Sequence, residues 1–251
     1  MSLFEVYWRA LSYLAVARRH VAVICVANVA LAVAMIAEPI VEINPADAGR
    51  FGIGDADIAR LSTSLGDVLL RALVTDRVPR GTVFAPMHWS GHYAANAGAG
   101  PLAAPLTDPV SGQPELKHVP VRVRREDVRW SGLLVSRRDI RPTGFVHWSR
   151  HKVEGGWVYE LCGAELPDQG IVLARGLLDP AGRDAMVEYA DCSGHAYRAA
   201  VTDKDATLLE ALFVAPWREL PSRDWVLSLL ATRAPLSPVD RMALLAGHAP
   251  V

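Results

Sequence analysis

The sequence predicts a mainly β protein, in which a closed barrel is followed by a smaller α+β unit. Three observations favour this class. Between residues 39 and 84, short apolar stretches alternate with turn residues at a spacing typical of barrels. A crossing over residues 86–117, with no helical or strand pattern, then leads to a further strand. Finally, the chain ends in two stretches that begin with helix-capping residues.

The barrel elements follow from alternation and turn chemistry. A short helix is expected to begin at Asn44 and Pro45, the N-cap and first helical position, and to end at Gly52. The turn at residues 65–67 offers Gly66, which can take positive φ. The strands expected in this region are 39–43, 57–62, 68–74, 82–84 and 119–123.

The pattern changes after Arg125. A helix is expected over residues 166–178, and two more close the chain. Ser222 can cap the first of these, and Ser237 with Pro238 begins the second. The strands expected here are 130–135, 145–148, 157–162, 186–189, 197–201 and 208–214. We therefore divide the chain into an atypical apolar segment at 1–36, a barrel at 37–125 and an α+β unit at 126–251.

Composition narrows the classes of function. A chain of 251 residues can bury one sizeable core, or a larger and a smaller one. Its net charge of −1 and pI near 6.7 argue against nucleic-acid binding, which needs a basic face. Arginines concentrate between residues 121 and 141. We interpret them as a solvated strand edge, and phosphate binding stays open as the alternative.

Cysteine and histidine spacing predicts no metal site. Cys25, Cys162 and Cys192 lie far apart, which excludes a local cluster of metal ligands and favours a reducing compartment, the cytoplasm. His88 and His92 are four residues apart, as are His147 and His151, and on a helix each pair could chelate a metal. Neither pair lies in a helical pattern.

The crossing over residues 86–117 is the candidate binding element. Its Gly, Ala, Pro and Asn content differs from that of a linker, and its small residues let the backbone lie close against a partner. At its mouth, His88 can hydrogen-bond and Trp89 can stack on a planar heterocycle. The alternative is that Trp89 only plugs the end of the barrel.

Two motifs in the crossing carry a family resemblance. The run PMHW at residues 86–89 and DPVSGQPELKHVPVRV at 108–123 resemble the C-terminal molybdopterin-guanine-dinucleotide-binding domain of assimilatory-type nitrate reductases. These enzymes belong to the dimethyl sulfoxide reductase superfamily. Residues 37–76 are similar to the same domain, and the looser similarity continues through 155–163, 212–226 and 237–247.

The resemblance implies a double-psi β-barrel and a set of cofactor contacts. Lys117 matches the family's cofactor-binding lysine, and Met87 matches another contact. Asp108 and Ser111 match the motif, either as contacts or as residues that shape the loop. With His88 and Trp89, these residues form the predicted site. A family Asn or Asp position falls near Gly100, so that contact is lost.

Residues 1–36 do not resemble the family, whose tryptophan- and histidine-bearing loop is missing here. The uncharged run Val21–Ala37 follows Arg18, Arg19 and His20. It has the length of a short membrane span, and also fits a signal peptide or anchor. We favour a buried segment or an aberrant N-terminus from a shifted reading frame, because the run enters the strand at Ile40 without a linker.

The expected function is the C-terminal cofactor-binding part of a molybdenum oxidoreductase that reduces nitrate to nitrite in nitrate assimilation. The resemblance implies molybdopterin guanine dinucleotide, no iron–sulfur cluster in this chain, and a catalytic body supplied as a partner chain or a missing N-terminal part. Alternatives are a non-catalytic remnant or a small barrel protein tethered to a membrane by residues 21–37. An independent hydrolase is disfavoured, because no nucleophile elbow or phosphate-binding loop is present.

Overall fold

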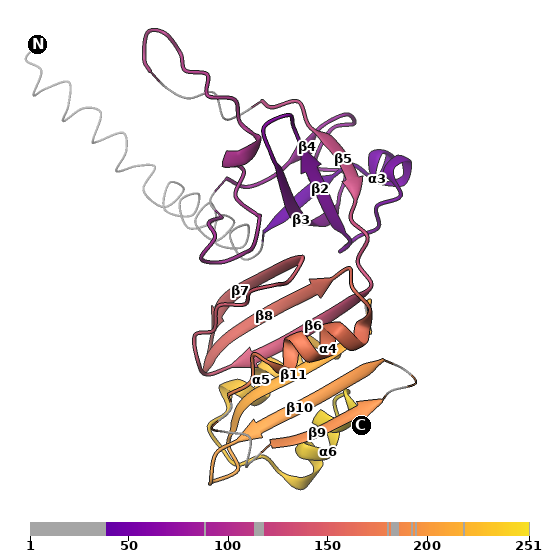
Figure 1. Cartoon of the computed structure of the whole chain (residues 1–251), viewed down its shortest axis with the longest axis vertical. Helices are drawn as coiled ribbons and strands as arrows, with labels where there is room; N and C mark the ends of the chain where they lie inside the picture. The colour runs from indigo at the N-terminus through magenta and orange to yellow at the C-terminus, as the bar shows by residue number, and fades with distance from the viewer. Residues whose placement is uncertain are drawn as a thin grey trace, which may run out of the picture. The chain divides into compact units, whose positions relative to one another are not determined.

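The computed structural model describes residues 39–87, 89–112, 118–179, 181, 186–191, 193, 195–217 and 219–250. Within these residues the chain is mainly β and forms two sheets (Figure 1). The two sheets are consecutive in sequence, the first ending at Arg125 and the second beginning at Trp130.

The first sheet has five strands in the order β4-β1-β3-β2-β5. Strands β1 and β3 pair in parallel, and the other neighbours are antiparallel. Its core is built from small and branched side chains, including Val41, Ile43, Leu61 and Leu70, all at most 1% exposed. The strands are β1 (Ile40–Ile43), β2 (Ile58–Ser62), β3 (Asp67–Val74), β4 (Val83–Phe84) and β5 (Arg122–Arg125).

The predicted short helix is confirmed as α3 (Pro45–Phe51). The Asn44 side chain accepts a hydrogen bond from the Ala46 amide, and Gly52 closes the helix at φ 64°. This is the left-handed conformation that glycine adopts without steric cost. Local capping chemistry therefore determines both ends of this helix.

Two expectations for the first sheet are wrong. Gly66 does not take positive φ; a Cβ there would approach Pro101 atoms to 3.0 Å, so the glycine permits a close contact with the crossing. The strand expected at 119–123 begins only at Arg122, because its pairing partner β2 ends at Ser62. Val119 and Val121 still pack against the first core.

The second sheet is an antiparallel meander in the order β7-β8-β6-β11-β10-β9. The strand expected at 145–148 lies instead at β7, since a buried arginine at position 150 interrupts the apolar alternation there. The elements are β6 (Trp130–Ser136), β7 (His147–Val153), β8 (Gly156–Gly163), α4 (Pro167–Arg175), β9 (Met186–Asp191), β10 (Ala196–Thr202), β11 (Leu208–Pro216), α5 (Arg223–Ala231) and α6 (Pro238–Ala246).

Helices cover both faces of the second sheet (Figure 1). Alternate residues of β6 point to opposite faces, as strand geometry requires. Trp130 and Leu134 pack in the core under α4, whereas Leu133 and Val135 pack in the core under α5 and α6. Gly170 of α4 lies directly on the Trp130 ring, where a Cβ would come within 2.3 Å of Cε2. The glycine is thus required for this helix to approach the sheet.

The two C-terminal helices differ in how they begin. Ser237 and Asp240 form a capping box at α6, and Gly247 ends that helix at φ 75°, as predicted. Ser222 does stand at the N-cap of α5, but its side chain makes no capping hydrogen bond. The amide groups at the start of α5 are therefore not satisfied by their N-cap side chain.

Candidate cofactor-binding site

Met87 and Trp89, near the start of the crossing, lie in different surroundings. Met87 is 46% exposed, so its thioether is available for contact. The Trp89 ring packs against the first core and meets Tyr93 edge-on, with ring centroids 6.2 Å apart. Its indole Nε1 is buried and has no hydrogen-bond partner. His88 and Lys117, two predicted contacts, lie outside the described residues.

The middle of the crossing packs against this chain itself. Ala94, Ala97 and Leu102 are buried in the first core. The backbone also pairs with the edge of β7: the Ala95 amide donates to the Trp148 carbonyl at 2.9 Å. The small residues at 94–102 thus allow a close approach to the protein's own second sheet. The expectation that they lie against a partner is wrong for this part of the crossing.

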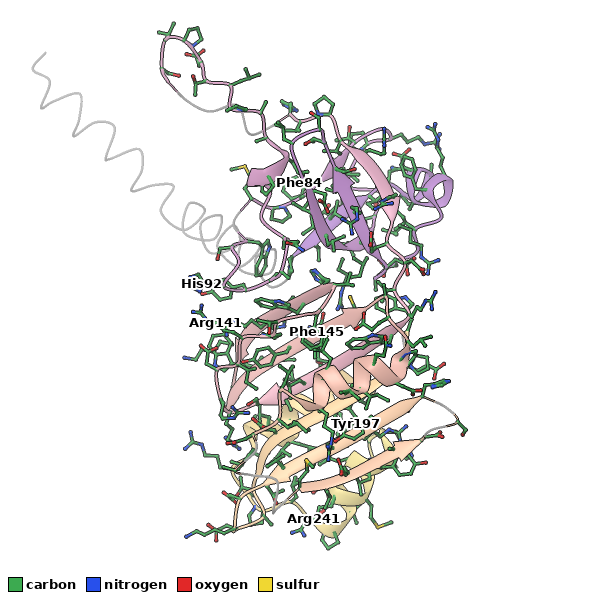
Figure 2. All side chains as sticks on the ribbon, viewed as in Figure 1. Phe84, His92, Arg141, Phe145, Tyr197 and Arg241 are labelled. Carbon is green, nitrogen blue, oxygen red and sulfur yellow. The ribbon has the colours of Figure 1, made fainter. Side chains whose placement is uncertain are left out.

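Arg150 holds the crossing on the second sheet. This side chain is only 4% exposed, and its Nε donates to the His92 carbonyl at 2.6 Å. The same residue pairs with Asp139, and its amide donates to the Tyr93 carbonyl. The His92 ring is turned outward toward Arg141, at 3.4 Å (Figure 2). Sequence reasoning missed Arg150, because an arginine in a strand reads as a surface residue.

The last described part of the crossing, residues 103–112, is mostly exposed. Asp108 accepts hydrogen bonds from the Val110 amide and from both the amide and hydroxyl of Ser111. These bonds, led by those from Ser111, lower the pKa of Asp108. The two predicted site residues therefore come together as a turn, and the carboxylate is engaged by its own loop.

A hollow of about 680 Å³ lies beside the strand that follows the crossing. His118, which directly follows Lys117 in sequence, lines this hollow. Arg50 and Arg122 bring positive charge to the wall, and Arg50 lies 5.7 Å from the centre of the Phe51 ring. Asp47, the one acid among the described residues of the wall, accepts a hydrogen bond from the Gly81 amide. The wall is formed by Asp47, Arg50, Phe51, residues 81–83 and residues 118–123.

The hollow can accommodate an anionic, partly planar organic group. Guanidinium groups suit phosphate oxygens, and an aromatic face suits a heterocycle. Sequence reasoning placed no site residue in α3. The signal that could have revealed it is the Arg50–Phe51 pair, a cation beside an aromatic residue in the last turn of that helix.

The His147–His151 pair does not form a chelating site, and His88 of the other pair lies outside the described residues. His147 and His151 both lie on β7, and residues four apart on a strand are separated by roughly 13 Å. Burial, followed by the Arg71 guanidinium, lowers the pKa of His147 from 6.5 to about 4. Burial also raises the pKa of Cys162 to about 12. Among the residues described, no group of three His, Cys, Asp or Glu side chains could hold a metal ion.

Comparison with known protein families finds a match to the part of the chain that contains the first sheet and the crossing. Residues 18–120 match the molydopterin dinucleotide binding domain family. The expectation that residues 18–36 do not resemble this family is therefore wrong. These residues therefore resemble a molybdopterin dinucleotide-binding domain, which supports the resemblance to the dimethyl sulfoxide reductase superfamily over this part of the chain.

Relatives extend the similarity beyond that domain. The nitrate reductase of Klebsiella oxytoca is 29% identical over 219 residues, which cover 84% of this chain and 23% of that protein. The F420-dependent formate dehydrogenase 1 subunit alpha of Methanococcus maripaludis is 34% identical over 88 residues, 35% of this chain and 12% of that subunit. This chain thus spans less than a quarter of the length of these relatives.

A further relative is of a different kind. The β-(1→2)glucan export ATP-binding/permease protein of Mesorhizobium japonicum is 65% identical over 40 residues, 16% of this chain and 7% of that protein. In the portion of the chain that the structure describes, no helix is both long and apolar enough to cross a membrane. The apolar run at 21–37 lies outside the described residues.

Proposed function

We propose that this chain is the C-terminal, cofactor-binding part of a molybdenum oxidoreductase that reduces nitrate to nitrite. The match of residues 18–120 to the dinucleotide-binding family carries this proposal. The alignment with a nitrate reductase over 84% of the chain favours nitrate over other substrates. We further propose the guanine form of the dinucleotide, a cytoplasmic location and a role in nitrate assimilation.

The first sheet is proposed to be part of a double-psi barrel. Its parallel pair β1 and β3, flanked by antiparallel neighbours, is compatible with that fold. Lys117 is proposed to bind the cofactor as a counter-charge at the exit of the crossing, beside the hollow lined by Arg50 and Arg122. Met87, His88 and Trp89 are proposed to contact it at the mouth, and Asp108 with Ser111 holds the connecting turn.

The proposed roles of the cofactor and of the protein residues differ. When bound, molybdopterin guanine dinucleotide supplies a molybdenum centre for oxygen-atom and electron transfer. The protein groups of this chain bind and orient the dinucleotide, and we assign it no catalytic residue. Iron–sulfur clusters and the residues around the metal are proposed to come from a catalytic body, supplied as a partner chain or as an N-terminal part of the same enzyme.

Co-expression tests this proposal. The chain is produced together with the N-terminal catalytic part of the Klebsiella relative, and the co-purified complex is analysed for molybdenum, guanine nucleotide and nitrate reduction. The expected result is stoichiometric molybdenum and nucleotide. Lys117→Ala is expected to lower retained nucleotide about tenfold, whereas Lys204→Ala, an exposed lysine in the β10–β11 turn, leaves it unchanged. A folded complex without molybdenum or nucleotide would contradict the proposal.

A second candidate function is a membrane-tethered barrel protein without redox activity. The stretch shared with an export permease and the uncharged run at 21–37 favour it. Fractionation of cells decides the matter: a tethered chain sediments with membranes and is released by detergent alone. Val29→Arg should then free the chain, while Ser12→Arg, outside the run, should not. Release of the unmodified chain by salt alone argues against the tether.

A further inference from the structure

The first sheet is open, and the hollow of about 680 Å³ touches both of its edge strands. Among the described residues, β4 pairs only with β1, and β5 pairs only with β2. Thr82 and Val83 line the hollow from the side of β4, and residues 118–123 line it from the side of β5. Edge strands present backbone donors and acceptors to which a further strand can pair. The hollow is therefore bordered by two such edges.

Residues 118–121, just before β5, have the character of a strand that lacks a neighbour. From Val119 to Val123, partly buried residues that pack against the first core alternate with exposed ones. Such alternation is typical of an extended backbone. The ladder between β2 and β5 ends at the pair Ser62–Arg122, and no backbone hydrogen bond joins residues 118–121 to another described residue. The segment is thus an extended edge without a pairing partner in the described part of the chain.

The backbone groups of the three valines in this segment point away from β2. The Glu126 amide donates to the Ile58 carbonyl at 2.8 Å, so the backbone of residue 126 faces β2. Along an antiparallel strand this facing alternates from residue to residue, and the pairing of β5 with β2 has no register shift. The even-numbered residues therefore face β2, and Val119, Val121 and Val123 present their amides and carbonyls to the free edge.

Pro120 does not block this edge. Proline has no amide hydrogen, and in sheets it is tolerated where no ladder bond is needed. By the same alternation, Pro120 faces the side of β2, beyond the end of that strand at Ser62. The missing donor therefore lies on the side away from the free edge.

The side chains along the edge define which strand fits. Residues that lie directly opposite each other in an antiparallel pair project from the same face of the sheet. A strand beside residues 119–123 would therefore place apolar side chains next to the partly buried valines. Its alternate side chains would lie beside Arg122, whose guanidinium favours a carboxylate, and Arg50 adds positive charge to the same wall. The complementary strand thus alternates apolar and acidic residues.

The size of the hollow agrees with a short strand. Sheet spacings of about 3.3 Å per residue, about 4.8 Å between strands and about 10 Å between layers give roughly 160 Å³ per residue. A volume of about 680 Å³ therefore holds about four residues of one extended strand.

We propose that residues 119–123 pair with one β-strand of a partner chain, in which apolar and acidic residues alternate. In such strand addition, main-chain hydrogen bonds give affinity and alternate side chains give specificity. The partner is the catalytic body, since this chain covers only 23% of the Klebsiella nitrate reductase and most of that protein has no counterpart here. The identity of the partner rests on the proposed function, whereas the edge and its chemistry do not. No role is assigned to Lys117 or to the cofactor.

A peptide tests the edge without any cofactor. The purified full-length chain is titrated at low salt with the fluorescein-labelled peptide SVEVEVS, and binding is followed by fluorescence anisotropy. The peptide SVKVKVS, in which the charge is reversed, is the control. The expected result is saturable binding of SVEVEVS, with SVKVKVS weaker by at least about tenfold.

Amide hydrogen exchange, measured by NMR, locates the bound peptide. SVEVEVS should slow exchange at the amides of Val119, Val121 and Val123, which face the free edge. The Arg124 amide is the internal control, because it faces β2 and should not change.

Variants separate recognition from a structural effect. Arg122→Glu should weaken SVEVEVS binding about fivefold and strengthen SVKVKVS binding, a reversal that a loss of structure does not produce. Arg241→Glu, at an exposed arginine on α6, should alter neither. Val121→Pro removes one outward amide and should weaken the binding of both peptides. Near-ultraviolet circular dichroism checks that each variant is folded.

Co-purification with the N-terminal catalytic part of the Klebsiella relative tests the identity of the partner. Arg122→Glu and Val121→Pro should each lower the recovered complex about fivefold, and Arg241→Glu should leave it unchanged. A complex that forms without molybdenum contradicts the proposed function and not this inference. A complex that both edge variants leave intact contradicts this inference, whatever its molybdenum content.

Three results with the peptides would each overturn the proposal. The first is no saturable binding of SVEVEVS, or equal affinity for the two peptides. The second is slow exchange of the Val119 and Val121 amides in the chain alone, since another segment of this chain or a second copy would then occupy the edge. The third is unchanged binding of SVEVEVS to folded Arg122→Glu or Val121→Pro, since the peptide would then bind elsewhere.

Discussion

The two sheets bury their apolar side chains in different ways. The second sheet is a regular antiparallel meander whose two faces are covered by helices: α4 on one, α5 and α6 on the other. The first sheet has shorter strands, and its core is completed by Ala94, Ala97 and Leu102 of the crossing. The second sheet also holds that crossing, through Arg150 and the edge of β7.

This difference suggests a division between framework and binding surface. In the second sheet, apolar residues and helices leave little of the core open to solvent. The second region does expose large apolar side chains, but they are spread over α4, β9 and α6: Leu166, Val172, Val187, Tyr189, Val239 and Met242. In the first region, such side chains gather along one segment, the crossing and its entry, at Phe84, Met87, Tyr93, Leu106 and Val110. Concentrated exposed apolar groups are typical of surfaces that contact a partner or ligand. The regular sheet thus acts as the support on which the irregular segment is displayed.

The largest expected effect tests whether the two sheets unfold together. Trp130 is fully buried beneath α4, so Trp130→Ala should cost about 3–5 kcal/mol of unfolding free energy. Because ion pairs and the crossing link the sheets, amide exchange should accelerate in β1–β3 as well as in β6–β11. Acceleration confined to the second sheet would show that the first is independently stable.

The second prediction concerns acid. The pKa of buried His147 is about 4 in the folded chain and near 6.5 when unfolded. Between these values the unfolded chain binds a proton at His147 that the native chain does not. The free energy of unfolding therefore keeps its full value above pH 6.5 and falls as the pH approaches 4. The loss is expected to reach about 3 kcal/mol.

Denaturant titrations across pH 4–7 measure this loss. His147→Gln should flatten the pH dependence, while His248→Gln, an exposed histidine near the C-terminus, should leave it intact. An unchanged pH profile in folded His147→Gln would assign the acid sensitivity to other groups.

The third prediction tests the attachment of the crossing. Arg150→Met removes a charged donor from the His92 and Ile140 carbonyls and should cost about 2–3 kcal/mol. Exchange at the Ala95 amide should rise more than at the centre of β6. Arg141→Met is the control, since that exposed arginine contacts His92 only at 3.4 Å. Equal effects of the two variants would contradict the role assigned to Arg150.

The smallest effects compare two leucines of the crossing. Leu102 is 6% exposed and Leu106 is 58% exposed. Leu102→Ala should cost about 2 kcal/mol, and Leu106→Ala less than about 0.5 kcal/mol. Chemical denaturation of both variants gives the values. Similar costs would mean that residues 103–112 pack as closely as residues 94–102.

Local signals in the sequence predicted many of the elements. The cap at Asn44, the ending at Gly52 and the capping box at Ser237 are each specified by residues within a turn of one another, and the structure confirms them. Strands β1, β2 and β3 were found at nearly their observed bounds, because short apolar runs bounded by turn residues mark buried strands.

The predictions were wrong where the conformation or burial of a residue depends on a contact with a residue far away in sequence. Gly66 was explained by turn geometry, but the close contact with Pro101 of the crossing is what leaves no room for a larger side chain there. The strand before Arg125 was placed three residues early because the end of its partner at Ser62 is invisible in the local pattern. Arg150 was missed, since its charge is neutralised by groups that lie close only in the folded chain.

The sequence by itself determined the resemblance to a molybdopterin dinucleotide-binding domain, the motifs at residues 86–89 and 108–123, and the ends of the capped helices. These depend on residue identity and on contacts within a few positions. Only the tertiary structure decided which half of the crossing is buried, and only it brought Arg71, His147, Glu160 and Arg223 around one cavity. The reason is physical: burial and charge pairing between β3, β7, β8 and α5 depend on distances in space, which chain order does not contain.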